Sequence, residues 1–341
     1  MVTPSPTSLR ERVEKGLPAL AEKIIAQPLS KLGGAPNLSQ TVHYEPLHTR
    51  HEPFDLNQTN EAIAGYIRSG EPFFVGRFGS TELRATLRWF NRTNRTRLEK
   101  MYGALALLEA PYFSRFENRK LRYDSGFFPI DSKSVAAFSQ LIIDSMPALD
   151  LLASWVPGEN IFEDQLRHAH LTTISHLEPF FANNPWSSAL AGKKVLVIHP
   201  FSESIEAQYH HARAHLFAHP QMLPDFELNT IRAVQSLGRP DTRFATWFDG
   251  LKWMIDEALS QDFDVAIIGC GAYGFPLSAR LKIEGRRVIH LGGVTQMLFG
   301  IGGKRWDGLP NHRALYNAHW VRPQEHENPQ RRKKLGQASY W

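Results

Sequence analysis

The sequence predicts an α/β fold in which helices cover both faces of a mostly parallel sheet. From residue 191 onward, short apolar runs alternate with segments of helical spacing, as successive β-α-β units do. A glycine-rich turn lies in the last of these units, between an apolar run and a helical pattern. The 341 residues are 42% hydrophobic and 21% charged, so the chain can bury a substantial core.

The first part of the chain is expected to be mainly helical. Residues 1–50 are predicted to form a helical N-terminal extension, because apolar residues recur at helical spacing until Pro28 and a Gly-Gly-Ala-Pro stretch interrupt them. One short buried strand is expected at 72–77. The helices predicted in this part span 9–25, 57–69, 80–90, 134–146 and 162–181.

The second part of the chain is expected to supply the rest of the sheet. Its predicted strands span 194–199, 227–234, 265–268 and 288–291. Helices are predicted between them, the first through residue 219, the next at 246–259 and the last ending at 285. These boundaries give an α/β domain over 51–322 and a polar, irregular tail over 323–341.

The glycine-rich turn has the Gly-x-Gly-x-x-Gly pattern of anion-binding loops. Gly269, Gly271 and Gly274 follow an apolar run, so that backbone N–H groups and a helix amino end point at one spot. A dinucleotide site would also need an acid at the tip of the next strand, and that tip reads His290-Leu-Gly-Gly293. We therefore expect a Rossmann-like turn for another phosphorylated ligand, with tight strand-to-helix packing as the alternative.

Four separated loops are expected to meet at one edge of the sheet. Each loop follows an apolar strand, and ligands of such sheets bind beyond the carboxyl ends of the strands. Small or polar residues suited to close backbone approach occur in every loop. The four segments are 77–82, 199–203, 269–274 and 291–294.

The first loop, Arg77-Phe-Gly-Ser-Thr-Glu82, joins a strand to a helix. Arg77 is a candidate fork for phosphate, Glu82 a candidate metal or hydroxyl contact, and Gly79 would let the backbone approach a nucleotide. The alternative is structural. In that case Ser80 caps the helix and Glu82 complements the helix dipole.

Further candidates lie after the other strands. His199 could donate to a phosphate oxygen or act as a base near neutral pH, or it could simply be satisfied by backbone. Ser202 could bind a sugar or cap a helix. Lys304 and Arg305 follow a glycine-rich stretch and could close over an anion, with a surface loop as the alternative.

Other chemistry has less support. His211, His215 and His219 recur every four residues, which suits zinc or a partly exposed polar face. Cys270 is the one cysteine, so an internal disulfide is excluded and its small size explains its place in the turn. Asp124 is a candidate general base. No nucleophile-elbow, Walker or paired-cysteine motif occurs.

The charge of the chain points to an acidic partner. The formal net charge is +5, with a pI near 9.3, which suits an anionic ligand or membrane surface. The sequence lacks the basic stripe with aromatics that nucleic-acid binding favours. Neither a signal peptide nor a long apolar run is found, so a cytoplasmic protein is expected. The basic run 331–334 is either a solvated terminus or a peripheral contact with the inner face of a membrane.

The first loop and the glycine-rich turn together resemble the GT-D-fold glycosyltransferases of bacterial surface polysaccharide and glycoprotein assembly. The early turn of that family typically reads Arg-Phe/Tyr-Gly-Asp-Gly-Glu, against Arg77-Phe-Gly-Ser-Thr-Glu82 here. The closing Trp320-Val-Arg-Pro323 is also similar, and the resemblance covers roughly residues 60 to 310. It implies a nucleotide-sugar donor at the sheet edge and a glycan or lipid-linked acceptor.

The resemblance also implies roles for particular residues. The family's Asp-x-Glu pair holds the diphosphate through Mn²⁺ or Mg²⁺, and its positions are Ser80 and Glu82 here. A serine hydroxyl is a weak ligand for such a cation, so metal dependence stays open. Glu82 and His199 are then the catalytic candidates. The expected donor and phosphate contacts are Arg77, Gly79, Ser80, Ser202, Gly269, Gly271, Ala272, Tyr273, Gly292, Gly293, Lys304 and Arg305.

Two other functions stay open at this point. One is a different Rossmann-type enzyme that uses a nucleotide or S-adenosylmethionine, although the acid it would need is missing at His290-Leu-Gly-Gly293. The other is a nucleotide-binding or scaffold protein of a glycan cluster, in which Ser80 marks lost catalysis. The sequence also leaves open the sugar, the acceptor, the stereochemical outcome and whether the chain forms a homo-oligomer.

Overall fold

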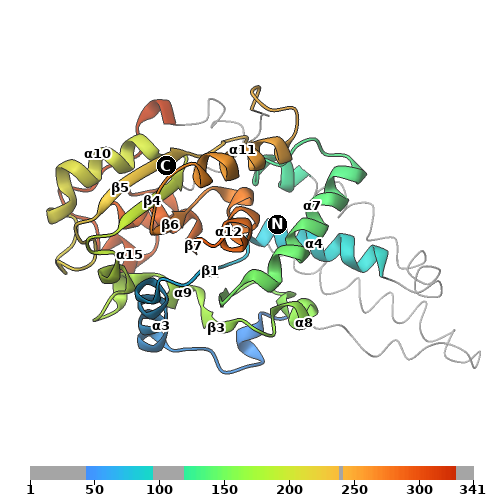
Figure 1. Ribbon diagram of the computed structural model, residues 1–341, viewed down its shortest axis with the longest axis horizontal. Coiled ribbons are helices and arrows are strands. Elements are labelled where there is room, and N and C mark those ends of the chain that lie inside the picture. The colour runs from blue at the N-terminus through green and yellow to red at the C-terminus, as the bar shows by residue number, and fades with distance from the viewer. Residues whose placement is uncertain (1–43, 95–118, 238–240, 328–341) are drawn as a thin grey trace, which may run out of the picture. The chain divides into compact units, whose positions relative to one another are not determined.

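Seven short strands, all paired in parallel, form a single sheet in the computed structural model, which describes residues 44–94, 119–237 and 241–327 (Figure 1). Their order across the sheet is β3-β2-β1-β7-β6-β4-β5. The predicted α/β, Rossmann-like fold is therefore confirmed. The strands are β1 (Phe73–Gly76), β2 (Leu151–Ser154), β3 (His170–Thr173), β4 (Lys194–His199), β5 (Glu227–Arg232), β6 (Val265–Ile268) and β7 (Arg287–His290).

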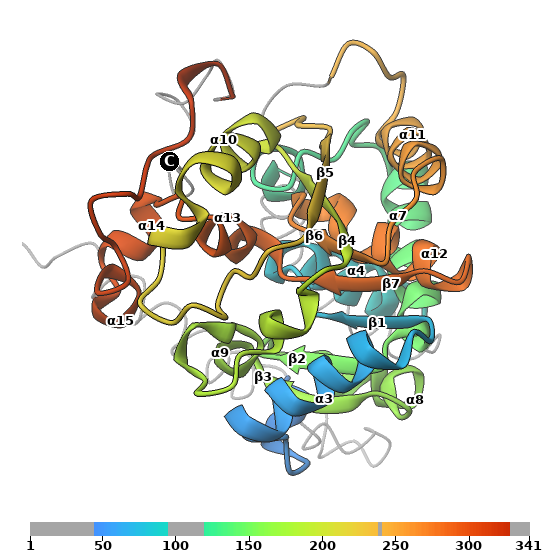
Figure 2. The ribbon, with the colours of Figure 1, turned by 60° about the vertical axis from the view of Figure 1, so that its left-hand side comes forward.

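Helices lie against both faces of this sheet, as Figure 2 shows. The longer ones are α3 (Leu56–Ser69), α4 (Ser80–Thr93), α7 (Ser132–Ser145), α10 (Ser202–Ala212), α11 (Trp247–Leu259) and α12 (Gly274–Ile283). Single turns are α8 (Glu163–Leu166), α9 (Ile174–Leu177), α13 (Thr295–Leu298), α14 (Lys304–Asp307) and α15 (Pro310–Arg313). Among the described helices, none has the length and apolar content to cross a membrane.

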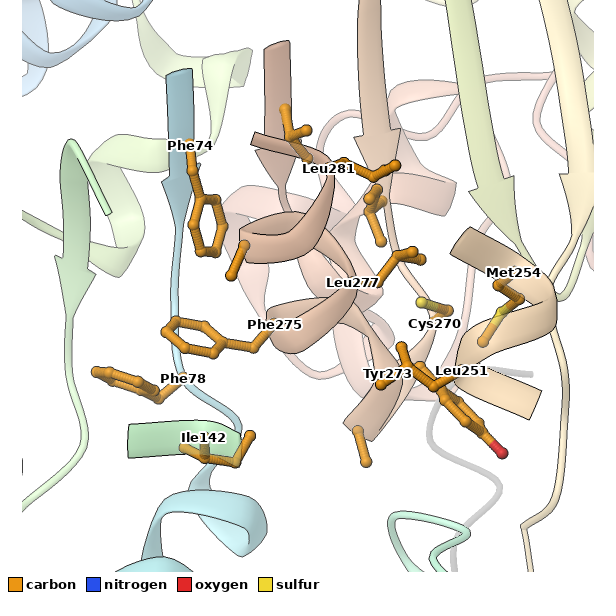
Figure 3. Packing of buried hydrophobic residues seen from close by; sticks show 14 of the residues in the cluster. Phe74, Phe78, Ile142, Leu251, Met254, Cys270, Tyr273, Phe275, Leu277 and Leu281 are labelled. Carbon is orange, nitrogen blue, oxygen red and sulfur yellow. The ribbon is translucent and has the colours of Figure 1, made fainter. Parts of the chain in front are cut away.

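Two apolar layers hold the helices to the sheet. Successive residues of a strand point to opposite faces, so Phe73 and Val75 join one layer while Phe74 joins the other. In the second layer, Phe275 of α12 packs on Phe74 with ring centroids 5.3 Å apart, and on Phe78 at 4.5 Å (Figure 3). Burial on both faces explains why the central strands are apolar throughout.

Local capping fixes where the main helices begin. At the start of α3, the Asp55 side chain accepts from the Gln58 backbone N–H, and the Gln58 side chain accepts from the Asp55 backbone N–H. Thr246 and Asp249 form the same pair of hydrogen bonds at the start of α11. Asp131 caps α7. These side chains satisfy N–H groups that the first turn of a helix leaves without partners.

Two strands are absent from the sequence prediction. β2 reads Leu-Leu-Ala-Ser, which has helix-favouring residues. Its backbone nevertheless pairs with β1 on one side and β3 on the other, and all four of its residues are buried. The helix predicted at 162–181 is wrong, because β3 pairs with β2 in its middle and leaves only the short α8 and α9 around it. The predicted helix 9–25 lies outside the described residues.

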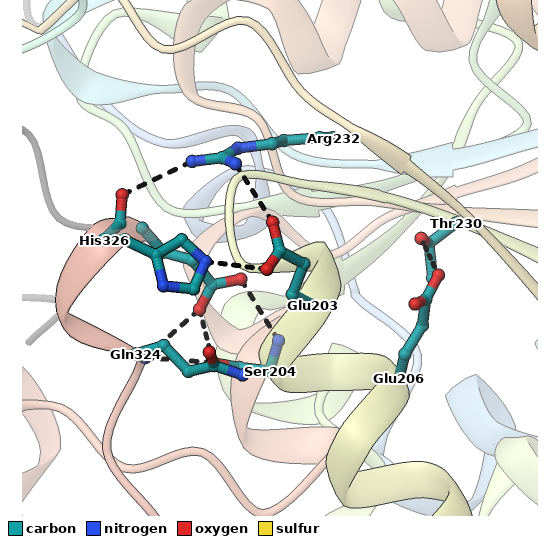
Figure 4. A network of polar contacts seen from close by, with 8 residues as sticks. Glu203, Ser204, Glu206, Thr230, Arg232, Gln324 and His326 are labelled. Carbon is teal, nitrogen blue, oxygen red and sulfur yellow. Dashed lines mark hydrogen bonds and ion pairs between the residues drawn. The ribbon is translucent and has the colours of Figure 1, made fainter.

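Both ends of the described chain pack on the sheet unit, although the sequence assigned them to the extension and the tail. Leu47 is buried in the core, and Gly158 donates to the carbonyl of Glu45 over 3.1 Å. At the other end, buried Glu327 accepts from the Ser204 backbone N–H over 3.1 Å and from the Ser204 hydroxyl. The Gln324 backbone N–H also donates to the Ser204 hydroxyl, over 3.0 Å (Figure 4). A segment distant in sequence therefore caps the amino end of α10.

Candidate functional site

The four predicted loops meet around one pocket of about 470 Å³. It lies beyond the carboxyl ends of β1, β4, β6 and β7, which are neighbours in the sheet. Its volume lies within the roughly 300–1,000 Å³ typical of small-molecule sites. The predicted residues that line it are Arg77, Gly79, Ser80, Glu82, His199, Gly269, Gly271, Tyr273, Gly293 and Arg305.

Four predicted contacts do not line the pocket. Ser202 is buried as the first residue of α10, and Ala272 is buried in the short 3-10 turn before α12. Gly292 lies behind the Arg77 side chain, and Lys304 is exposed outside the lining. Proximity in sequence to a lining residue was therefore not enough to place these groups at the pocket.

The strand order explains why the pocket forms here. From β1 the chain proceeds outward to β2 and β3, while β7 lies on the other side of β1. From β4 it proceeds to β5 and then returns to β6 on the opposite side. Loops at such reversal points diverge and leave a crevice above the strand ends.

Arg77 follows β1 and faces the loop after β7. Its NH1 group donates to the Phe78 carbonyl over 3.1 Å, and its guanidinium lies 5.8 Å from the ring centroid of Trp155. Gly292, at a φ of +67°, gives this side chain room, since a Cβ there would lie 2.6 Å from Arg77 Cζ. Contacts from three loops thus fix the guanidinium in the pocket wall.

The amino end of α4 carries Glu82 into the lining. The N-cap is Gly79 and not the predicted Ser80, which is the first residue of the helix. The Glu82 carboxylate folds back over Gly79, where a Cβ would lie 2.5 Å from Glu82 Cδ. Its position in the first turn complements the helix dipole, so a structural role and a ligand contact are both compatible with this geometry.

The three glycines of the turn serve two different purposes. A Cβ at Gly269 would lie 2.5 Å from the Gly292 carbonyl oxygen, and one at Gly274 would lie 2.7 Å from His290 Cδ2, so both positions are needed for packing. Gly271, at a φ of +60°, has nothing within 4 Å of an added Cβ and is exposed. Gly269 and Gly271 both line the pocket, and of these two Gly271 has space for a ligand around its Cα.

His199 is better suited to donate a hydrogen bond than to act as a base. Burial lowers its pKa from 6.5 to about 3, so the ring is neutral near pH 7. Its Nδ1 accepts from the Phe201 backbone N–H over 3.0 Å, which leaves the proton on Nε2. Cys270 beside it is also buried, and burial raises the pKa of its thiol, which argues against a nucleophilic cysteine.

The described part of the chain does not bring together the side chains of a dedicated metal site. Among the residues that the structure describes, no group of three His, Cys, Asp or Glu side chains could hold an ion. The zinc hypothesis for the histidine triad is not supported, because α10 ends at Ala212, before His215 and His219. His219 instead contacts the Asn183 carbonyl at 3.0 Å. For a divalent cation, Glu82 beside the neutral Ser80 is a sparse set of ligands.

Asp124, named above as a candidate general base, also lines the pocket, as do Pro200, Phe201 and Cys270 of the predicted loops. The lining residues that sequence reasoning missed are Ser125, Trp155, Val234, Gln235, Ser236, Leu237, His290 and Gln296. Trp155 follows β2, a strand that the sequence does not predict, and its indole N–H donates to the Phe78 carbonyl over 2.9 Å. Gln235 and its neighbours follow β5 at the same edge. The rule about strand ends would have found that loop had it been applied to every predicted strand.

Comparison of the chain with protein-family models, with curated proteins and with solved structures finds no match. The geometry and charge of the pocket are therefore the basis for assigning a function.

Proposed function

We propose that this chain is a glycosyltransferase whose pocket binds a nucleoside-diphosphate sugar. One observation carries the proposal: loops after four neighbouring parallel strands converge on a single pocket that holds both Arg77 and Glu82. The pocket is large enough for a small-molecule donor, and polar groups interrupt an otherwise mostly apolar wall.

The diphosphate would lie near Arg77. A guanidinium can donate two parallel hydrogen bonds to phosphate oxygens, and the contacts of Arg77 with Trp155 and Gly292 hold it in place beforehand. The lining also includes residues at the amino ends of α4, α10 and α12, where helix dipoles favour negative charge. Arg305 of α14 adds a second cation to the wall.

The transfer itself needs a place for one proton. An acceptor hydroxyl oxygen would form a bond to the anomeric carbon as the bond from that carbon to the diphosphate breaks. The hydroxyl proton must then pass to a base, and Glu82 and Asp124 are the carboxylates of the lining. His199, neutral with its proton on Nε2, would donate to donor or acceptor rather than take that proton. Arg77 would stabilise the charge on the departing diphosphate.

A thermal-shift screen of the full chain tests the ligand class. The panel is nucleoside diphosphates, nucleotide sugars, NAD and S-adenosylmethionine, each with and without Mn²⁺. A ligand that binds only the native state raises its melting temperature. We expect a nucleoside diphosphate or its sugar to do so, whereas a shift with NAD or S-adenosylmethionine alone would contradict the proposal.

Two substitutions then separate binding from turnover of the identified donor. Arg77→Ala should weaken donor binding by about ten- to a hundredfold, the value of a charge-assisted hydrogen bond. Glu82→Gln should retain binding and lower turnover by about a hundredfold or more. Lys252→Ala is the control, because Lys252 is exposed on α11 and paired with Asp256. Unchanged binding and turnover in both variants would refute the assignment, and saturable binding without turnover in the parent would indicate a binding protein.

A further inference from the structure

A second pocket, of about 560 Å³, adjoins the first. It lies at the carboxyl end of β5 and beside α11, and Pro200 and Gln235 line both pockets. The two pockets therefore share part of their wall at these residues. A molecule in the second pocket would be next to a ligand in the first, which is the arrangement that a group-transfer reaction requires.

The wall of this second pocket combines an aromatic ring with a rigid ion pair. Arg243 lies over the Trp253 ring at 5.3 Å from its centroid. The same guanidinium donates bidentate hydrogen bonds to Asp241, from NH2 to Oδ2 at 2.8 Å and from Nε to Oδ1 at 3.1 Å. This contact lowers the pKa of Asp241, so that the pair stays ionised. The ring and the guanidinium thus have a fixed position before any ligand binds.

Several polar side-chain atoms of this wall can still form hydrogen bonds with a ligand. Within the described ranges, the side chains of Gln235, Gln261 and Glu257 make no hydrogen bond, and neither does NH1 of Arg243. Amides supply both donors and acceptors, the carboxylate accepts, and the guanidinium donates. Hydroxyl groups both donate and accept, so a polyhydroxylated ligand can use each of these partners.

The charges of the wall argue against an anionic ligand. Its two arginines are already neutralised, Arg243 by Asp241 at 2.8 Å and Arg232 by Glu203 at 3.1 Å. Glu257 adds a negative charge that no described cation pairs. A phosphate or carboxylate placed here would meet repulsion without a free cation, whereas a neutral sugar would not.

We propose that this second pocket binds the saccharide acceptor through apolar contact with the part of the Trp253 ring that lines the pocket and through hydrogen bonds to Gln235, Gln261 and the Asp241–Arg243 pair. This inference rests on the proposed glycosyltransferase function, because it assigns the hydroxyl-bearing partner of the same reaction. Gln235 contacts both ligands, since it lines the boundary between the two pockets.

Ligand-observed NMR on the full chain tests this assignment without any donor present. The probes are methyl glycosides of neutral hexoses and N-acetylhexosamines, with methyl glucuronide as the anionic comparison. We expect a neutral glycoside to bind in preference to the glucuronide. Trp253→Ala should weaken its binding about tenfold, and Gln261→Ala about fivefold, as the loss of the aromatic contact and of one hydrogen bond predict. Lys252→Ala, on the same helix but outside the wall, should bind like the parent.

Three outcomes would overturn the proposal: no neutral glycoside binds the parent, the glucuronide binds more tightly, or both wall variants bind like the parent. Gln261→Ala decides the matter if Trp253→Ala does not fold, because the Gln261 side chain makes no hydrogen bond with a described residue. Nucleoside diphosphate binding is measured in parallel and should be unchanged in the wall variants. Its absence from the parent would refute the proposed function, while the glycoside result would still stand for the second pocket.

Discussion

Replacing Gly292 by alanine tests the placement of Arg77 without changing Arg77 itself. A Cβ at position 292 would lie 2.6 Å from Arg77 Cζ, so the guanidinium must leave its present position. Position 292 also has a φ of +67°, where alanine costs roughly 1–2 kcal/mol relative to glycine. The guanidinium is the end of a flexible side chain and can turn away, so the loss of stability should be that backbone cost plus about 1 kcal/mol for the Phe78 hydrogen bond and the Trp155 contact that it leaves.

Gly285→Ala is the matched control. Its φ is +79°, it has nothing within 4 Å of an added Cβ, and it precedes β7 at the opposite end of the strand from Gly292. Urea unfolding should therefore show a loss of about 1–2 kcal/mol for Gly285→Ala and about 1 kcal/mol more for Gly292→Ala, both at unchanged m-value. Only Gly292→Ala should lose affinity for a nucleoside diphosphate, by about tenfold or more in a calorimetric titration.

The reasoning is refuted if the Gly292 and Gly285 variants bind the nucleotide equally well. Combination with Arg77→Ala sharpens the result. Since both substitutions remove the same contact, the double variant should bind no more weakly than Arg77→Ala alone. Additive losses of affinity would mean that Gly292 acts through something other than Arg77.

Two further predictions concern stability. The pKa of His199 is lowered from 6.5 to about 3, so between these pH values the unfolded chain binds a proton that the native state does not. As the pH drops from about 6.5 towards 3, this group alone should lower the free energy of unfolding by about 1.4 kcal/mol per pH unit, and the buried His290, whose pKa is also lowered to about 3, should add a similar amount. His199→Asn should reduce the pH dependence of the free energy of unfolding, measured by urea unfolding, by about 1.4 kcal/mol per pH unit. An unchanged pH dependence would show that the buried His199 ring does not cause it. Gly274→Ala should cost about 1–3 kcal/mol, because its Cβ would meet the buried His290 ring. Gly65→Ala, in the middle of α3 with open space around it, should instead stabilise by about 0.5–1 kcal/mol, so equal effects of the two would contradict the packing described here.

The sheet was predictable where strands are buried on both faces and rich in β-branched residues. Val195 to Ile198 and Val265 to Ile268 have that composition, and both are strands in the structure. β2 could not be found in the same way, because Leu-Leu-Ala-Ser is extended only through its pairing with two neighbours. Short elements of this kind depend on tertiary contacts that a single sequence does not reveal.

The site was predictable in its loops and less so in its individual side chains. The rule about strand ends brought Arg77, His199 and Gly271 together correctly around one pocket. It could not show that His199 is buried and neutral, or that Gly292 serves to accommodate Arg77. Burial and side-chain direction decide such details, and neither is readable from motif spacing. Whether these residues hold a sugar nucleotide stays a prediction.

The place of β7 has a consequence for how the molecule is assembled during synthesis. Among the described strands it is the last to be made, yet it lies in the centre, between β1 and β6. Before it emerges from the ribosome, β3-β2-β1 and β6-β4-β5 can exist only as two separate half-sheets, each with an open edge exposed to pairing with other chains. Amino-terminal fragments that end before Arg287 should therefore aggregate, since they lack the strand whose backbone pairing joins β1 to β6.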